Sequence, residues 1–312
     1  MGLRVIRPGP SATVQDRGRV GYRSFGVPVG GAFDLGSHDL ANALLGNEPG
    51  ASTLELTLVG GIYRAETTLG LGLAGAPMGC TIRDPSGRER TLHVPQTTTI
   101  DPGEDLIIGG TPRGARTYLS VRGGWQTPPI LGSRSTEERL RAGDLLPAEP
   151  GSTLTRRPCL TPEIGLEDDP IRVIDGPDPA ISEGDSRLLE SGEFLVSSKA
   201  DRMGLRLEGP RIDREGPDDR ASAPVSPGAV QIAGGRPIVL GVAGGTMGGY
   251  LHLAHVISAD LERLAQLRPG DRLRFRRIEV EEARRIDRAD RRERARWLAR
   301  IALIQGFAEG LD

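Results

Sequence analysis

Short apolar segments alternate with Gly, Pro and Asp along most of the chain. Runs of this length, bounded by turn residues, are typical of strands in barrels and sandwiches. In the first half they cover residues 3–7, 54–58, 69–76, 91–94, 105–109 and 116–121. In the second half they cover residues 171–175, 193–197, 205–207, 229–232, 237–242 and 272–278. The pattern therefore predicts a mainly β protein.

Three segments have helical spacing instead. Between Asp34 and Leu45 the apolar residues recur three and four apart, and Gly46-Asn47 supplies a stop. A second helix is predicted from about 251 to 267. A third, amphipathic and rich in charge, is predicted from Val280 to Ile304. The fold expected from these patterns is strand-rich, with a few short helices and a C-terminal helix.

The length of the chain indicates more than one packed unit. Its 312 residues exceed the ~250 residues at which a single core stops growing. Residues 148–170 are rich in Pro, Thr and acidic side chains and have little periodicity, as is typical of a boundary. We therefore expect an N-terminal β domain over 1–160, a C-terminal β domain over 161–279, and the amphipathic helix over 280–312.

Composition narrows the classes of function. The formal net charge is -2, so no global basic field exists to hold nucleic acid or an anionic membrane. No window approaches the ~20 apolar residues of a membrane span. Lys199 is the sole lysine, which leaves little room for lysine chemistry. Cys80 and Cys159 have no metal-site spacing, and a reduced, cytoplasmic protein is expected.

Two apparent motifs carry little weight. The sequence Gly70-x-Gly72-x-x-Gly75 matches a dinucleotide fingerprint, but Pro77 and Gly79 would break the helix that must follow it. His252 and His255 could share a face of the predicted helix, yet no third ligand accompanies them, and hydrogen-bonded histidines are favoured over a metal site. No P-loop motif is present, so ATP would have to bind by another route or on a partner.

Polar side chains crowd between glycines near the N-terminus, in the block Thr13 to Tyr22. Asp16 can accept an amide N–H, Gln15 can both donate and accept, and Arg19 can hold a carboxylate or a phosphate at two points. The alternative is a structural turn in which the Asp and an Arg pair with each other. The residue types alone leave both interpretations open.

This block and others after it resemble the allophanate hydrolase subunit 2, or biotin-dependent carboxyltransferase, family. The matching blocks occur in order over residues 3–278. They include Thr13-Val14-Gln15-Asp16-x-Gly18-Arg19-x-Gly21-Tyr22, Gly26-Val27-Pro28-x-Gly30-Gly31-Ala32-Phe33-Asp34, Ala41-Asn42-x-Leu44-x-Gly46-Asn47, Leu131-Gly132-Ser133-Arg134-Ser135-Thr136, Asp201-Arg202-Met203-Gly204, Gly228-Ala229-x-Gln231 and Gly248-Gly249-Tyr250.

The resemblance implies a fold of two cyclophilin-like β-barrels. Family members are the PxpC component of ATP-dependent 5-oxoprolinase, the KipA-type antagonist of a kinase inhibitor, and half of the carboxyltransferase domain of urea carboxylase. All act beside an allophanate hydrolase subunit 1-type (PxpB- or KipI-like) partner, and a PxpA-like protein joins in 5-oxoproline ring opening. The implied substrate is a small amide. The implied cofactor is ATP used by the complex; biotin is left open, and no metal is expected.

Side-chain chemistry and motif position assign the candidate residues. Asp16, Arg19 and Asp34 are expected to be catalytic. Substrate binding is expected from Gln15, Asn42, Asn47, Arg134, Ser135, Arg202, Gly248, Gly249 and Tyr250. These side chains would bind a polar amide and stabilise oxyanion character. The hypothesis requires Asp16, Arg19, Asn42 and Tyr250 to converge on one hollow between the two barrels.

The chain departs from the family pattern at two places. The loop after Thr136 is short, and Ala243-Gly244-Gly245-Thr246-Met247 stands where the family carries an Asp and a Gln-Thr-Thr run. An Ala cannot replace an Asp as acceptor or base. Three functions therefore stay open: a 5-oxoprolinase or urea-type carboxyltransferase component, a KipA-like regulator without chemistry of its own, and a stand-alone sugar or amide hydrolase.

Overall fold

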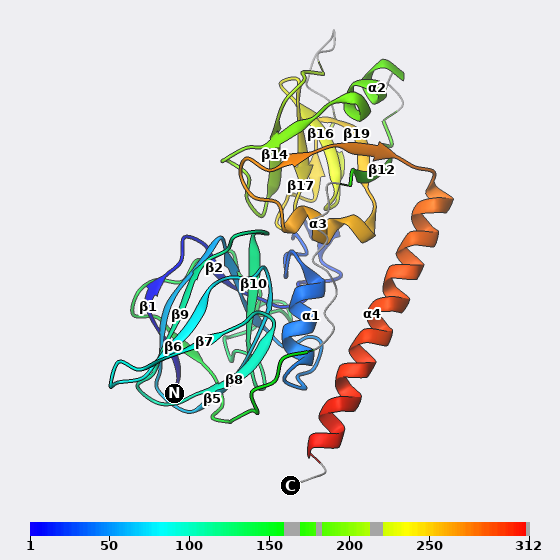
Figure 1. The fold of residues 1–312 in the computed structure, drawn as a ribbon. Helices are drawn as coiled ribbons and strands as arrows, with labels where there is room; N and C mark the ends of the chain where they lie inside the picture. Colours follow the sequence, from blue (N-terminus) through cyan, green and yellow to red (C-terminus); the bar gives the residue numbers. More distant parts are fainter. Residues whose placement is uncertain (159–168, 179–182, 213–220, 310–312) are drawn as a thin grey trace. The chain divides into compact units, whose positions relative to one another are not determined.

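The computed structural model describes residues 1–158, 169–178, 183–212 and 221–309 (Figure 1). Within helix α4 (Val280–Glu309), side chains are described as far as residue 302. Strands dominate and helices are few, as the sequence pattern predicts. The predicted mainly β class and the C-terminal helix are confirmed.

The chain divides into two compact units. Unit 1 comprises Met1–Gly18, Asp34–Ile164 and Arg294–Asp312, and unit 2 comprises Arg19–Phe33 and Gly165–Glu293. The sequence analysis placed residues 19–33 in the N-terminal domain, whereas here they are part of unit 2. Three contacts explain this: Gly30 N donates to Val242 O at 3.0 Å, Arg202 Nη2 donates to Gly31 O at 2.6 Å, and Phe33 is in the apolar core of unit 2.

Unit 1 contains two antiparallel sheets. The first has the order β11-β1-β4-β9-β6-β7, formed by Leu145–Pro147, Gly2–Pro8, Val59–Ala65, Asp105–Gly110, Cys80–Arg83 and Glu89–Leu92. The second has the order β2-β3-β10-β5-β8, formed by Ala12–Gln15, Thr53–Thr57, Arg116–Val121, Leu69–Gly75 and Gln96–Ile100. Leucines and isoleucines of both sheets, together with Trp125 after β10, form one buried core.

Helix α1 (Leu35–Ala43) covers the face of the second sheet that points away from this core, and it packs on β3, β5 and β10 (Figure 1). Glycines in β5 allow this close approach. A Cβ at Gly72 would lie 2.8 Å from the carbonyl oxygen of Ala41 in α1 and 2.6 Å from Ser120 Oγ. The glycine fingerprint of the sequence is therefore part of a buried strand, and no helix follows it, as Pro77 and Gly79 predict.

Unit 2 is built on an eight-stranded sheet of order β20-β13-β14-β17-β16-β19-β12-β21. Its strands are Arg272–Leu273, Phe194–Val196, Gly204–Glu208, Arg236–Leu240, Ala229–Ala233, Leu251–Val256, Ile171–Asp175 and Phe275–Arg277. The first and last strands are separated in the chain by Arg274 alone, so the sheet nearly closes into a barrel around its apolar core. A small ribbon pairs β15 (Ala223–Pro224) with β18 (Met247–Gly248).

Short helices complete unit 2. They are η1 (Arg23–Phe25), α2 (Glu183–Ser191), η2 (Ser258–Asp260) and α3 (Leu261–Ala265). The predicted helix over 251–267 is wrong in its first half, because residues 251–256 form β19 and pair with β12 and β16. The physical reason is a bulge: the register shifts between Val230 and Gln231, which breaks the alternation of β19 and gives it helix-like spacing of buried residues.

Candidate functional site

Polar side chains form a buried layer on the face of the second sheet in unit 1 that carries α1. The strand register aligns Thr13 with Glu55 and Glu55 with Tyr118. Their neighbours Leu54 and Leu119 point to the opposite face and enter the core. All three polar side chains are at most 2% exposed. We call this set, with Gln15 and Thr53 of the next row, the polar layer.

Glu55 is the charged centre of the polar layer. The Tyr118 hydroxyl donates to Glu55 Oε2 at 2.6 Å, and Arg116 Nε lies 3.3 Å from Glu55 Oε1. Burial, followed by the negative charge of Glu55, raises the pKa of Tyr118 well above its usual value. The tyrosine therefore stays protonated, and its oxygen also accepts from the backbone N–H of Asp34 at 2.8 Å.

Asp34 begins helix α1. Its Oδ1 accepts from Ser37 N at 2.9 Å and its Oδ2 from Ser37 Oγ at 2.7 Å, which is an N-cap of the helix. One turn later His38 is fully buried, with Nδ1 3.0 Å from Thr53 Oγ1. Burial lowers the pKa of His38. The start of α1 is thus fixed to the polar layer by Asp34, His38 and Tyr118.

Asp16, at the end of β2, accepts four hydrogen bonds. Its Oδ1 accepts from Gly18 N at 2.7 Å and from the hydroxyls of Ser133 and Ser135 at 2.6 Å each, and its Oδ2 accepts from Arg134 N at 2.6 Å. Burial acts to raise the pKa of Asp16, but these four donors outweigh it, and the pKa lies below its usual value. An ionised carboxylate held in this way positions the loop 133–136 and is poorly suited to remove a proton.

The same loop carries two further candidates, Arg134 and Ser135, and is bound by a third, Gln15 of β2. The side chain of Arg134 donates to Thr127 O, and Ser135 Oγ also accepts from Asp16 N at 3.0 Å. Gln15 Nε2 donates to Thr136 O at 2.7 Å, while Gln15 Oε1 is a buried acceptor without a partner among the described residues. The structure thus brings four of the candidate residues together, namely Gln15, Asp16, Arg134 and Ser135.

Asn42 and Asn47 also lie together, although their amides are engaged with the chain itself. Asn42 Nδ2 donates to Ala51 O at 2.8 Å, and Asn47 Nδ2 donates to Asn42 Oδ1 at 3.0 Å. Asn47 also bonds the backbone of Val121 and Gly123 at 2.8 Å each. This geometry gives both asparagines a role in fixing the turn after α1. A role in substrate binding stays a prediction.

The remaining candidates belong to unit 2. Arg202 is buried against Gly31, and the backbone N–H of Ala243 donates to Arg202 O at 3.1 Å. Arg19 is part-exposed, its backbone N–H donates to Val29 O at 2.7 Å, and its guanidinium lies beside Gly30. Asp16 and Asn42 lie in unit 1, whereas Arg19 and Tyr250 lie in unit 2, so their convergence on one hollow stays a prediction.

The glycine run before Tyr250 lies over a buried amide. Tyr250 itself is 50% exposed. A Cβ at Gly248 would lie 2.6 Å from Gln231 Nε2, so the ribbon strand β18 rests directly on the Gln231 side chain. Sequence analysis placed Gly248, Gly249 and Tyr250 at the site but gave no role to Gln231 of the quoted motif.

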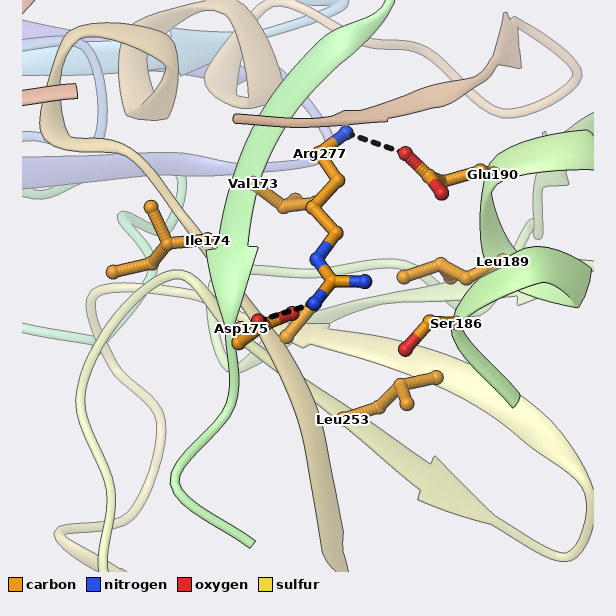
Figure 2. A pocket seen from close by; sticks show the side chains of 9 residues that line it. Val173, Ile174, Asp175, Ser186, Leu189, Glu190, Leu253 and Arg277 are labelled. Atoms are coloured by element: carbon orange, nitrogen blue, oxygen red, sulfur yellow. Dashed lines mark hydrogen bonds and ion pairs between the residues drawn. The ribbon is translucent and has the colours of Figure 1, made fainter. Parts of the chain in front are cut away.

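A separate hollow in unit 2 lies between α2 and the strands β12, β19 and β21 (Figure 2). None of the candidate residues lines it. Its charged groups are paired with one another: Arg277 Nη2 contacts Asp175, and Glu190 Oε1 accepts from Arg277 N at 3.0 Å (Figure 2). The hollow therefore offers apolar walls from Val173 and Leu189 and little spare charge for a ligand.

Among the described residues, no group of three or more His, Cys, Asp or Glu side chains is placed to hold a metal ion. Within the same residues, no helix has the length and apolar character needed to cross a membrane.

The two β-rich units, antiparallel except for the parallel pairing of β12 with β21, have the fold of a carboxyltransferase domain. The family model described as carboxyltransferase domain, subdomain A and B, matches residues 25–277, and the chain belongs to this family. The resemblance inferred from the sequence motifs is confirmed.

Individual relatives refine this placement. The chain is 32% identical over 313 residues to the C component of 5-oxoprolinase from Escherichia coli (strain K12), with 96% of this chain and 97% of that protein covered. It is 30% identical to urea amidolyase of Lachancea kluyveri, covering 91% of this chain but 17% of that enzyme. The crystal structure of the K. lactis urea amidolyase superposes with a TM-score of 0.80 at 27% identity, covering 94% of this chain and 20% of that chain.

Proposed function

We propose that this chain is the carboxyltransferase-type component of an ATP-dependent 5-oxoprolinase, working with an allophanate hydrolase subunit 1-type partner. One observation carries the proposal. The match to the C component of 5-oxoprolinase covers 97% of that protein, whereas the match to urea amidolyase covers 17% of the enzyme. The match extends over nearly the whole length of a protein that is a separate component of 5-oxoprolinase. It therefore favours a role for this chain as such a component.

The chemistry demands polar recognition and charge stabilisation. 5-Oxoproline is a lactam with a free carboxylate, and its amide opens only after its carbonyl has been polarised. Within the proposal ATP supplies the driving force in the complex, and this chain binds and orients the substrate. Arg19 is the candidate for the carboxylate, because it is part-exposed whereas Arg202 is buried against Gly31.

The test is to co-express this chain with a subunit 1-type protein and a PxpA-like protein, and to assay the ATP-dependent consumption of 5-oxoproline. We expect turnover that requires this chain, and Arg19→Ala should raise KM for 5-oxoproline with little change in thermal melting. Arg113→Ala, at an exposed position in unit 1, is the matched control and should behave as the wild type. ATP-dependent carboxylation of urea in place of 5-oxoproline consumption would overturn the proposal in favour of a urea-type component.

A regulatory function is the second candidate. The loop from Gly241 to Gly249 carries no carboxylate or carboxamide, and its backbone is closely packed on Arg202 and Met203. A site that lacks these groups has lost an acceptor for a lactam N–H, which favours a KipA-like protein that binds its partner without turnover. A stable complex with the subunit 1-type partner, together with no consumption of 5-oxoproline or urea, would support this candidate.

A further inference from the structure

Two histidines of β19 face one another although they are three residues apart on a strand. Residues at this spacing on a regular strand point to opposite faces. The bulge in β19 changes this, since His255 lies opposite Ala229 and His252 lies opposite Gln231. Positions 229 and 231 share one face of β16, so both histidines and Gln231 lie on the same face of the sheet.

The ring nitrogens are close enough to act together. His255 Nδ1 lies 3.3 Å from His252 Nε2, and the ring centroids are 5.4 Å apart. In a tetrahedral site with metal–nitrogen bonds of ~2.0–2.1 Å, two imidazole nitrogens are about 3.3–3.4 Å apart. The observed separation therefore matches one edge of a tetrahedral coordination shell without any movement of the backbone.

The positions of the ring protons decide what this contact does. With an N–H on one of the two facing nitrogens, the contact is a hydrogen bond between the rings. With both N–H groups on the outer nitrogens, the two facing nitrogens are acceptors, and their lone pairs can bind one cation that lies to the side of the line joining them.

The surroundings supply one charged and one polar group. Asp178 adds negative charge near His252. Gln231 Nε2, on the same face, is a buried donor without a partner among the described residues, and Gln231 is 4% exposed.

We propose that His252 Nε2 and His255 Nδ1 form an open binding site for a divalent transition metal of the class that prefers imidazole, such as Zn²⁺. No third His, Cys, Asp or Glu in the described part of the chain completes a cluster with them. The remaining coordination positions are therefore taken by water or by an anionic ligand, and the Gln231 amide donates a hydrogen bond to that group.

The test uses the untagged full chain and Zn²⁺ as the probe. Isothermal titration should show one Zn²⁺ per chain, and His252→Gln and His255→Gln should each weaken binding by about tenfold or more, since a ligand contributes at least as much as its outer partners. His93→Gln is the matched control: His93 is exposed in unit 1, and this variant should bind as the wild type does. Equal Zn²⁺ affinity in the wild type and in His252→Gln would overturn the proposal, as would the absence of binding in the wild type.

A second measurement covers variants that fold poorly. Nitrogen NMR of the wild-type chain should show the imidazole signals of its four histidines. Zn²⁺ should shift the signals of two of these rings, and both of these signals should still be present in His93→Gln. A shift confined to the His93 ring, or no shift at all, would contradict the site. Because these readouts require no turnover, they stand or fall separately from the proposed 5-oxoprolinase activity.

Discussion

The hydroxyl of Tyr118 donates a 2.6 Å hydrogen bond to Glu55, directly across the β3–β10 register. The same oxygen accepts from Asp34 N and so connects the sheet to the start of α1. A buried carboxylate is costly unless donors surround it, and here the donors include a phenol and a guanidinium. The pair therefore secures the position of α1 over the polar layer.

Tyr118→Phe should destabilise unit 1 more than an ordinary loss of a hydrogen bond. The change leaves Glu55 short of a donor and Asp34 N short of an acceptor, so we expect a loss of about 2–4 kcal/mol in the free energy of unfolding. The control is Tyr63→Phe, because Tyr63 is equally buried but donates to a neutral carbonyl, that of Gly60, at 2.8 Å. Urea denaturation of both variants measures the difference, and equal losses would contradict the role given to Glu55.

Asp16 should make stability depend on pH in the acid range. Its folded-state pKa lies below the usual 3.8, so the ionised carboxylate stabilises the fold above that pH. As the pH falls through this range, the unfolded chain takes up the proton first and the stabilisation is lost. Asp16→Asn should be less stable than wild type at neutral pH, and the gap should narrow on acidification. Denaturant unfolding at several pH values measures the gap.

Ser135→Ala gives the companion measurement. It removes one of the four donors to Asp16, so the pKa of the carboxyl in the folded protein should rise toward its unfolded value. The acid loss of stability should then be smaller than in the wild type and level off at a higher pH. If the difference in the free energy of unfolding between wild type and Asp16→Asn stayed constant across the acid range, the ionisation of Asp16 would contribute nothing to stability. The sequence left ligand binding and a structural turn open for Asp16, and a large loss of stability would favour the turn.

Local patterns predicted most of the strands because alternation and turn residues are properties of neighbouring positions. The runs at 116–121 and 171–175 coincide with β10 and β12. The failure at 251–256 has a tertiary cause. The bulge opposite Val230 and Gln231 exists only through pairing with β16, and the spacing it imposes on β19 resembles that of a helix.

The candidate site was predictable in part for a related reason. The motifs identified Asp16, Arg134 and Ser135, and these do lie together. The partners that determine their chemistry come from far along the chain: Ser133 is 117 residues from Asp16. The sequence analysis therefore assigned no role to Glu55 or Tyr118, because their contact depends on the pairing of β3 with β10. The alternation of polar residues along 13–15 and 53–55 was one clue to the polar layer.

Cys80 should be inert to thiol reagents in the folded protein. It is 1% exposed, and burial raises the pKa of its thiol to about 12. Since the thiolate is the reactive form, labelling must wait for unfolding. A Cys159→Ser variant isolates the Cys80 signal, and Ellman's reagent at mildly alkaline pH should show no reaction until denaturant is added. Rapid labelling of the folded variant would mean that the apolar core of unit 1 opens readily.

Gly72→Ala tests the contact between β5 and α1. The added Cβ would lie 2.6 Å from Ser120 Oγ and 2.8 Å from the Ala41 carbonyl, and the latter belongs to the helix backbone. Because the backbone must move to relieve that overlap, we expect a loss of about 1–3 kcal/mol in the free energy of unfolding. Gly79→Ala is the control, since a Cβ there meets nothing within 4 Å and Gly79 has no positive φ. Urea denaturation of both variants measures this loss. If both unfolded at the same urea concentration, α1 would not be packed closely on the sheet.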